Sequence, residues 1–177
     1  MEKVRLASIL RKAYSGELAA ALAYAGHWRS LPPGDDRSAI RRIEQEELLH
    51  RRELGNMLEE IGEPPSALRE TWFRIVGKTI AYLCHIGGWF IPMYGAGRLE
   101  AGNVREYEDA ARLARTAGYE RFVIPLVRMS VVEAEHERYF REKTSSHWLS
   151  RIVPLWPAPR ESSDWLNDTS RPVTILE

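Results

Sequence analysis

Residues 40–57 read IRRIEQEELLHRRELGNM, and this pattern governs how the chain folds. The apolar residues recur every three or four positions, which predicts an amphipathic helix with one buried face. Glu47 and His50 interrupt that face, three residues apart. An ionised carboxylate is costly to bury unless it is paired or coordinates a metal, so the interruption needs a physical reason.

The same interruption recurs in residues 126–140, LVRMSVVEAEHERYF, where Glu133 and His136 lie on the apolar face. Glu-x-x-His places a carboxylate and an imidazole one helical turn apart, so both can reach one metal ion. A single copy of so short a motif carries little weight, but here each of two long helices has one. Because several buried carboxylates would repel one another, a pair of divalent cations is the simplest explanation.

Two further helices each supply one more carboxylate. Glu17 lies in the small and apolar stretch SGELAAALAY, and Glu100 lies in GAGRLEAGNV. Measured from the turn at 31–34, Glu17 and Glu47 both lie roughly 20 Å along their helices, at about 1.5 Å per residue. Glu100 and Glu133 match to within about one helical turn when measured from the turn that joins their own helices. The alternative to metal is a set of buried polar side chains paired by hydrogen bonds.

The periodicity predicts an all-α four-helix bundle with a long crossover between the second and third helices. The 177 residues fit one domain, and 25 Lys and Arg balance 25 Asp and Glu, so nucleic acid is not an expected partner. We expect residues 146–177, rich in Trp and Pro, to pack as an irregular tail on the bundle of residues 1–145 or on a neighbouring subunit of a homodimer. The expected helices cover residues 4–30, 36–61, 92–117 and 121–144.

Residues 79–97 carry no charged side chain apart from His85, yet they contain several Gly and a Pro. Such breakers favour a buried or interfacial segment over a membrane span. The segment has three expected roles: substrate entrance, peripheral membrane contact or contact with another subunit. Cys84, the single cysteine, can form neither an internal disulfide nor a four-cysteine metal site. The first ten residues do not resemble a secretory signal, so the expected location is the cytoplasm.

The ligand pattern repeats within the chain. Tyr24 follows Glu17 by seven residues and Tyr107 follows Glu100 by seven, and each of these helices pairs with a Glu-x-x-His helix. The sequence resembles the ferritin-like di-iron and di-manganese carboxylate proteins across about residues 5–144. That resemblance implies two iron ions, or two manganese ions, with Glu47 and Glu133 as bridges. The full implied ligand set is Glu17, Glu47, His50, Glu100, Glu133 and His136.

Within that superfamily, WFRIVGKTIAYLCHIGGWF (72–90) and RLEAGNVREY (98–107) are most similar to demethoxyubiquinone hydroxylase, in which an apolar crossover also leads into a helix with this Glu and Tyr spacing. Rubrerythrins are similar too, but their rubredoxin module needs four cysteines. The resemblance implies an oxidoreductase that uses an unidentified reductant to reduce dioxygen or peroxide, with a quinone-like substrate near residues 79–97. The alternatives are a ferroxidase or peroxide scavenger without organic substrate, and a metal-storage bundle.

Several other polar residues have an ordinary alternative. Tyr24 and Tyr107 are candidate catalytic residues that would hydrogen-bond a ligand carboxylate or carry an electron, and core packing explains them equally well. No Glu stands three residues before His27, His85 or His147, so we interpret these as non-ligands. The carboxylates outside the apolar phase are expected to face solvent: Glu46, Glu53, Glu135 and Glu137.

Overall fold

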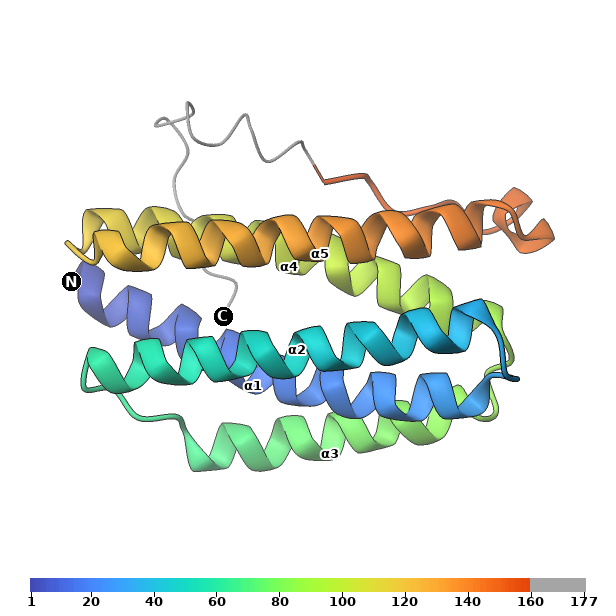
Figure 1. Cartoon of the computed structure of the whole chain (residues 1–177), viewed down its shortest axis with the longest axis horizontal. Coiled ribbons are helices and arrows are strands. Elements are labelled where there is room, and N and C mark those ends of the chain that lie inside the picture. Colours follow the sequence, from blue (N-terminus) through green and yellow to red (C-terminus); the bar gives the residue numbers. More distant parts are fainter. Residues whose placement is uncertain (160–177) are drawn as a thin grey trace. The chain divides into compact units, whose positions relative to one another are not determined.

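The chain is all-helical, as the periodicity predicts. The computed structural model describes residues 1–159, and within them there are five α-helices and no strand (Figure 1). No helix among the described residues is both long enough and apolar enough to cross a membrane. The elements are α1 (Glu2–Ser30), α2 (Asp35–Glu60), α3 (Ala67–Cys84), α4 (Phe90–Thr116), α5 (Glu120–Ser145) and the 3-10 helix η1 (Trp148–Arg151).

The crossover contains α3, a fifth helix that the sequence pattern did not reveal. Ser66 caps its start, because the side chain accepts a hydrogen bond from the amide of Arg69 at 3.4 Å. Among its residues only Gly77 and Cys84 are buried, so no apolar stripe of helical period marks a core-facing side. Of the glycines that made residues 79–97 look broken, Gly87 and Gly88 follow the end of α3, whereas Gly95 and Gly97 lie within α4.

Backbone contacts divide the chain into two compact units, whose boundaries fall inside α1 and α4. The unit Leu10–Pro92 holds most of α1 with α2 and α3, and we call it the α1–α3 unit. The other consists of Met1–Ile9 and Met93–Glu177, and we call it the α4–α5 unit.

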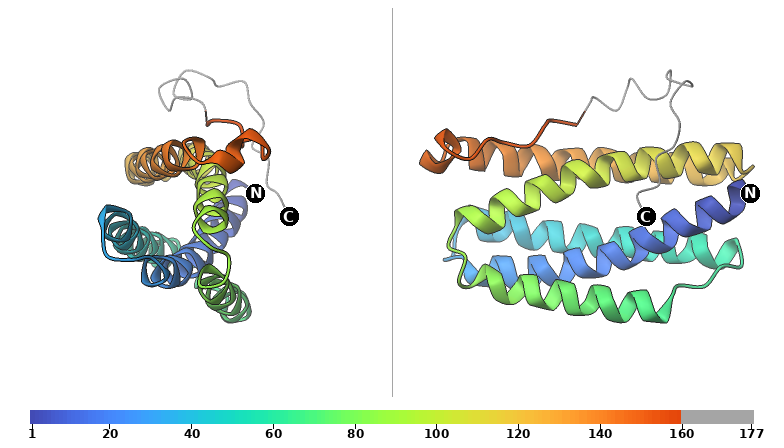
Figure 2. Two further views of the ribbon diagram at one scale, coloured as in Figure 1. Left: turned by 90° about the vertical axis from the view of Figure 1, so that its right-hand side faces the viewer. Right: turned by 180° about the vertical axis from the view of Figure 1, so that it is seen from behind.

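In the α1–α3 unit, α1 and α2 form an antiparallel hairpin (Figures 1 and 2). Leu31-Pro32-Pro33-Gly34 ends α1, because proline lacks the amide donor that the next helical turn needs. The predicted apolar stripes of both helices face inward. Their buried residues include Ala13, Ala20, Tyr24, Ile40, Ile43, Leu54 and Met57.

Small residues bring α3 close to α1. A Cβ atom on Gly26 of α1 would lie 2.5 Å from the Cβ of Ala81, and one on Gly77 of α3 would lie 2.6 Å from the carbonyl oxygen of Ala19. Real Cβ atoms essentially never approach so closely, so both positions require glycine. The two helix backbones therefore contact each other along a narrow stripe of Gly and Ala.

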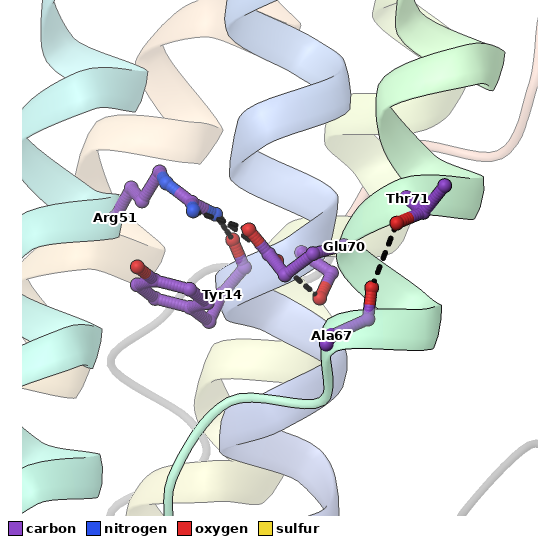
Figure 3. Close-up of polar contacts among 6 residues, drawn as sticks. Tyr14, Arg51, Ala67, Glu70 and Thr71 are labelled. Atoms are coloured by element: carbon purple, nitrogen blue, oxygen red, sulfur yellow. Dashed lines mark hydrogen bonds and ion pairs between the residues drawn. The ribbon is translucent and has the colours of Figure 1, made fainter.

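An ion pair joins α3 to both other helices of this unit (Figure 3). Glu70 of α3 accepts a hydrogen bond from the Ser15 hydroxyl at 2.7 Å and forms a salt bridge with Arg51 of α2. Arg51 also donates to the carbonyl oxygen of Tyr14, and its guanidinium carbon lies 3.7 Å from the centre of the Tyr14 ring. One acidic side chain thus fixes the start of α3 against α1 and α2.

In the α4–α5 unit, α4 and α5 also run antiparallel (Figure 2). Gly118, with φ of 81°, confirms the predicted left-handed stop after α4. The Tyr119 amide then donates to the carbonyl oxygen of Ala114 at 2.8 Å, which satisfies a carbonyl at the helix end.

Trp156 anchors the start of the tail on α4 and α5. Its side chain is only 5% exposed, and its indole N–H donates to Glu137 of α5 at 2.6 Å. The ring lies directly over Gly97, where any Cβ atom would clash with it. The Tyr94 hydroxyl of α4 holds the chain two residues before Trp156, by donating to the Pro154 carbonyl oxygen at 3.0 Å. Trp165 lies outside the described residues.

Glu137 is buried, so the expectation that it faces solvent is wrong. Trp156 covers its carboxylate, and Arg141 donates to the same oxygen at 2.7 Å. The helical phase of Glu137 could not reveal this environment, because the covering residue comes from the tail.

The α1–α3 contact gives a first test. Gly26→Ala should lower the free energy of unfolding by about 1–3 kcal/mol, because the new methyl group overlaps Ala81. Gly16→Ala on the same helix meets no atom within 4 Å and should raise it by up to about 1 kcal/mol, since alanine restricts the unfolded chain. Urea unfolding followed by circular dichroism measures both. Equal effects of the two substitutions would contradict the close packing.

The tail anchor gives a second test. Trp156→Ala should cost about 3 kcal/mol of unfolding free energy, because it empties the space over Gly97 and removes the donor to Glu137. Trp148→Ala is the matched control, because Trp148 is 63% exposed and its loss should change stability by less than about 0.5 kcal/mol. Denaturant titrations compare the two variants, and similar midpoints for both would show that Trp156 does not anchor the tail.

Candidate metal centre

Three of the predicted ligands meet in the α1–α3 unit. Glu17 comes from α1, and Glu47 and His50 come from successive turns of one face of α2. All three are buried, and each offers a ligand atom within 4.8 Å of the others. The α2 face explains this geometry, since residues three apart in a helix point the same way.

The α4–α5 unit holds an equivalent triad. Glu100 comes from α4, and Glu133 and His136 come from α5. These three residues are also buried, with ligand atoms within 4.8 Å of one another. The Nδ1 atom of His136 lies 3.9 Å from Oε2 of Glu133, a distance that leaves space for a shared ion rather than a direct hydrogen bond. Each triad therefore combines one Glu with one Glu-x-x-His pair.

The donor chemistry of each triad fits a divalent cation. Two carboxylates in a buried group repel each other unless a positive charge lies near them. One divalent ion balances the charge of two carboxylates, and oxygen with imidazole donors suits iron or manganese. Buried Glu and His clusters of this kind could hold metal.

Asn103 is a polar contact that sequence reasoning missed. Its side-chain amide donates to Oε2 of Glu100 at 3.0 Å and to Oε2 of Glu133 at 3.4 Å. Asn103 stands three residues after Glu100, and the residue three after Glu17 is Ala20. Comparison of the two halves was therefore the signal that could have drawn attention to Asn103, because this polar residue aligns with Ala20. The amide orients both carboxylates of its triad.

The two tyrosines of the repeat are buried. Tyr24 lies on α1 and Tyr107 on α4, each two helical turns beyond its Glu. Burial is compatible with core packing and with a hydrogen bond to a ligand carboxylate. A catalytic role for Tyr24 and Tyr107 stays a prediction.

The apolar segment 79–97 is mixed in its exposure. The expected entrance lies beside Trp89, Phe90 and Met93; Phe90 and Met93 are buried, and Trp89 is half-buried. The exposed large residues of the segment are Ile80, Tyr82, Leu83, Ile86 and Ile91. A substrate that entered beside Phe90 and Met93 would therefore require the Phe90 and Met93 side chains to move.

The chain matches no protein-family model, no curated protein and no solved structure. The two triads are therefore the structural features that bear on function.

The other titratable residues expected to be non-ligands lie outside both triads. His147 caps η1 by accepting a hydrogen bond from the Leu149 amide at 3.2 Å, and His85 is exposed. Burial lowers the pKa of His27 from 6.5 to about 4, with Asp36 opposing that change. Burial also raises the pKa of the Cys84 thiol to about 11, which keeps it protonated and poorly reactive at neutral pH.

The lowered pKa of His27 predicts how the free energy of unfolding changes with pH. Between about pH 6.5 and pH 4 the unfolded chain binds a proton at His27 and the folded chain does not, so stability falls as the pH falls. The His27 contribution to this loss is about 3 kcal/mol. Urea titrations at pH 7 and pH 4 should show that His27→Asn loses less stability than the wild-type protein over this range. Equal losses would mean that His27 is protonated in the folded state.

Proposed function

We propose that the two triads combine into one dinuclear metal centre and that the protein is a ferritin-like di-iron oxidoreductase acting on dioxygen or peroxide. The observation that supports this proposal is the presence of two equivalent buried triads of Glu, Glu and His. A core that contained only hydrogen-bonded polar pairs would not require the same three donors twice, each time with the same Glu-x-x-His spacing.

Charge balance supports the proposed stoichiometry. The centre contains four carboxylates, and two divalent cations neutralise them completely. In the proposed arrangement, Glu17 and His50 would hold one ion, and Glu100 and His136 would hold the other. Glu47 and Glu133 would be shared by both ions, as the resemblance implies. An arrangement with one ion would leave two excess negative charges in a buried environment, which is strongly unfavourable.

The chemistry of the proposed function comes from the bound ions, which can together supply two electrons to an oxygen–oxygen bond. The protein side chains exclude bulk water, because all six ligands are buried. Asn103 fixes the orientation of Glu100 and Glu133. Iron is the proposed metal, and manganese is the alternative that the same ligands accept. A quinone-like molecule is the proposed organic substrate, because the sequences of the crossover and of α4 resemble demethoxyubiquinone hydroxylase.

Metal content tests the centre. The wild-type protein loaded with Fe(II) without oxygen should retain about two ions per chain after desalting, measured by elemental analysis. Glu47→Ala should lose at least one ion, because it removes a proposed bridge. Glu53→Ala, which removes an exposed carboxylate from the same helix, should keep both. Unchanged metal content in Glu47→Ala, with circular dichroism showing a folded protein, would overturn the bridging assignment.

Oxygen consumption separates the possible reactions of the loaded protein. Uptake that increases when a short-chain quinol is added supports the quinone substrate. Uptake driven by Fe(II) and indifferent to quinol indicates a ferroxidase instead. A loaded protein that consumes neither dioxygen nor peroxide and shows no change in its iron absorption would contradict the oxidoreductase proposal and favour metal storage.

A further inference from the structure

The side chain of Asn103 connects two carboxylates of one triad. Its amide nitrogen lies 3.0 Å from Oε2 of Glu100 on the same helix and 3.4 Å from Oε2 of Glu133 on α5. An amide nitrogen carries two N–H groups, so it can donate to both oxygens at once. Neither bond involves Oε1 of the two carboxylates. Asn103 therefore spans the α4–α5 triad from one helix to the other.

A contact of this kind lowers the free-energy cost of binding a metal ion. A Glu side chain loses rotamer freedom when an ion fixes it, and two carboxylates repel each other until the ion arrives. The Asn103 amide fixes the orientation of both carboxylates, and its N–H dipoles partly balance their charge. The α4–α5 triad is thus partly organised for an ion before the ion binds.

The corresponding position in the α1–α3 triad has no such donor. Ala20 stands three residues after Glu17 and is 5% exposed, and its side chain has no polar atom that could orient the carboxylate. Asn103 is half-buried, whereas the two carboxylates that it contacts are fully buried. The α4–α5 triad is therefore in contact with a polar side chain that water reaches, and Ala20 provides no equivalent contact.

We propose that the α4–α5 triad binds the first metal ion, because Asn103 holds two of its ligands in place, and that the α1–α3 triad binds the second ion more weakly. This inference rests on the proposed metal centre and adds an order of loading to it. Asn103 is a positioning residue, since it contacts ligand carboxylates and not the ion. Residues that hydrogen-bond to metal ligands contribute about 10- to 100-fold to metal affinity, which sets the expected difference between the two dissociation constants.

Calorimetric titration of the full chain with Fe(II), in the absence of oxygen, tests the order of loading. The wild-type protein should show two binding events whose dissociation constants differ at least about tenfold. His136→Gln should remove the tighter event, because His136 belongs to the α4–α5 triad, and His50→Gln should remove the weaker event. The reverse assignment, or equal dissociation constants in the wild-type protein, would overturn the proposal.

Asn103→Ala tests the positioning role. It should weaken the tighter event about 10- to 100-fold and the weaker event less than about threefold. Asn103→Gln keeps an amide donor and should recover part of the lost affinity. Asn56→Ala is the matched control, because Asn56 is exposed on α2 and lies outside both triads. This control should bind both ions like the wild-type protein.

A purely structural role for Asn103 would give a different result. Its removal would then weaken both binding events equally or leave both unchanged, and either outcome would overturn the proposal. Circular dichroism of the metal-free variants shows whether they are folded, and the histidine variants decide the order even where Asn103→Ala does not fold. A wild-type protein that binds no Fe(II) would overturn the metal centre together with this inference. Two equal binding events would overturn only the order of loading.

Discussion

The burial of four carboxylates is the constraint on which the rest of the structure depends. An ionised carboxylate costs several kcal/mol to remove from water unless a positive charge or strong donors replace the lost hydration. Each of these carboxylates lies on a long regular helix, where its ligand atoms are close to those of another Glu and a His. Glu47 and Glu133 are fully buried on α2 and α5, each with a histidine one turn later. Regular helices suit this task, since a shift of one residue would move the carboxylate by about 100° around the axis.

Periodicity predicted those parts of the fold that have one buried face. The helices around Glu47 and Glu133 were predicted because a Glu on an otherwise apolar stripe is visible in the sequence itself. The crossover helix α3 was missed for the opposite reason. Only Gly77 and Cys84 of this helix are buried, so its apolar residues do not mark a buried face. Glu137 shows a third case. Its burial depends on Trp156, nineteen residues away in sequence, and no local pattern carries such information.

The two glycines at the contact between α1 and α3 have a packing role that the sequence alone does not suggest. Gly77 and Gly26 look like weak points of a helix, because glycine lowers helix propensity by about 1 kcal/mol relative to alanine. In the structure they are the places where two backbones meet, and larger residues would separate α3 from α1. The loss of helix propensity is offset by contact between the helices and by the Arg51–Glu70 pair. The crossover is consequently a fixed structural element whose outer side chains are free to contact other molecules.

The internal repeat also explains why two similar triads need not behave alike. Each triad contains two carboxylates and one imidazole, so the repeat makes both triads compatible with a divalent cation. Asn103 contributes an amide donor to the α4–α5 triad, whereas Ala20 at the corresponding place in the α1–α3 triad has no polar side chain. A hydrogen bond to a ligand carboxylate fixes its orientation and reduces the charge that it donates to a metal. Two ions bound by these triads would therefore experience different fields, and Asn103 is one source of that asymmetry outside the set of six ligands.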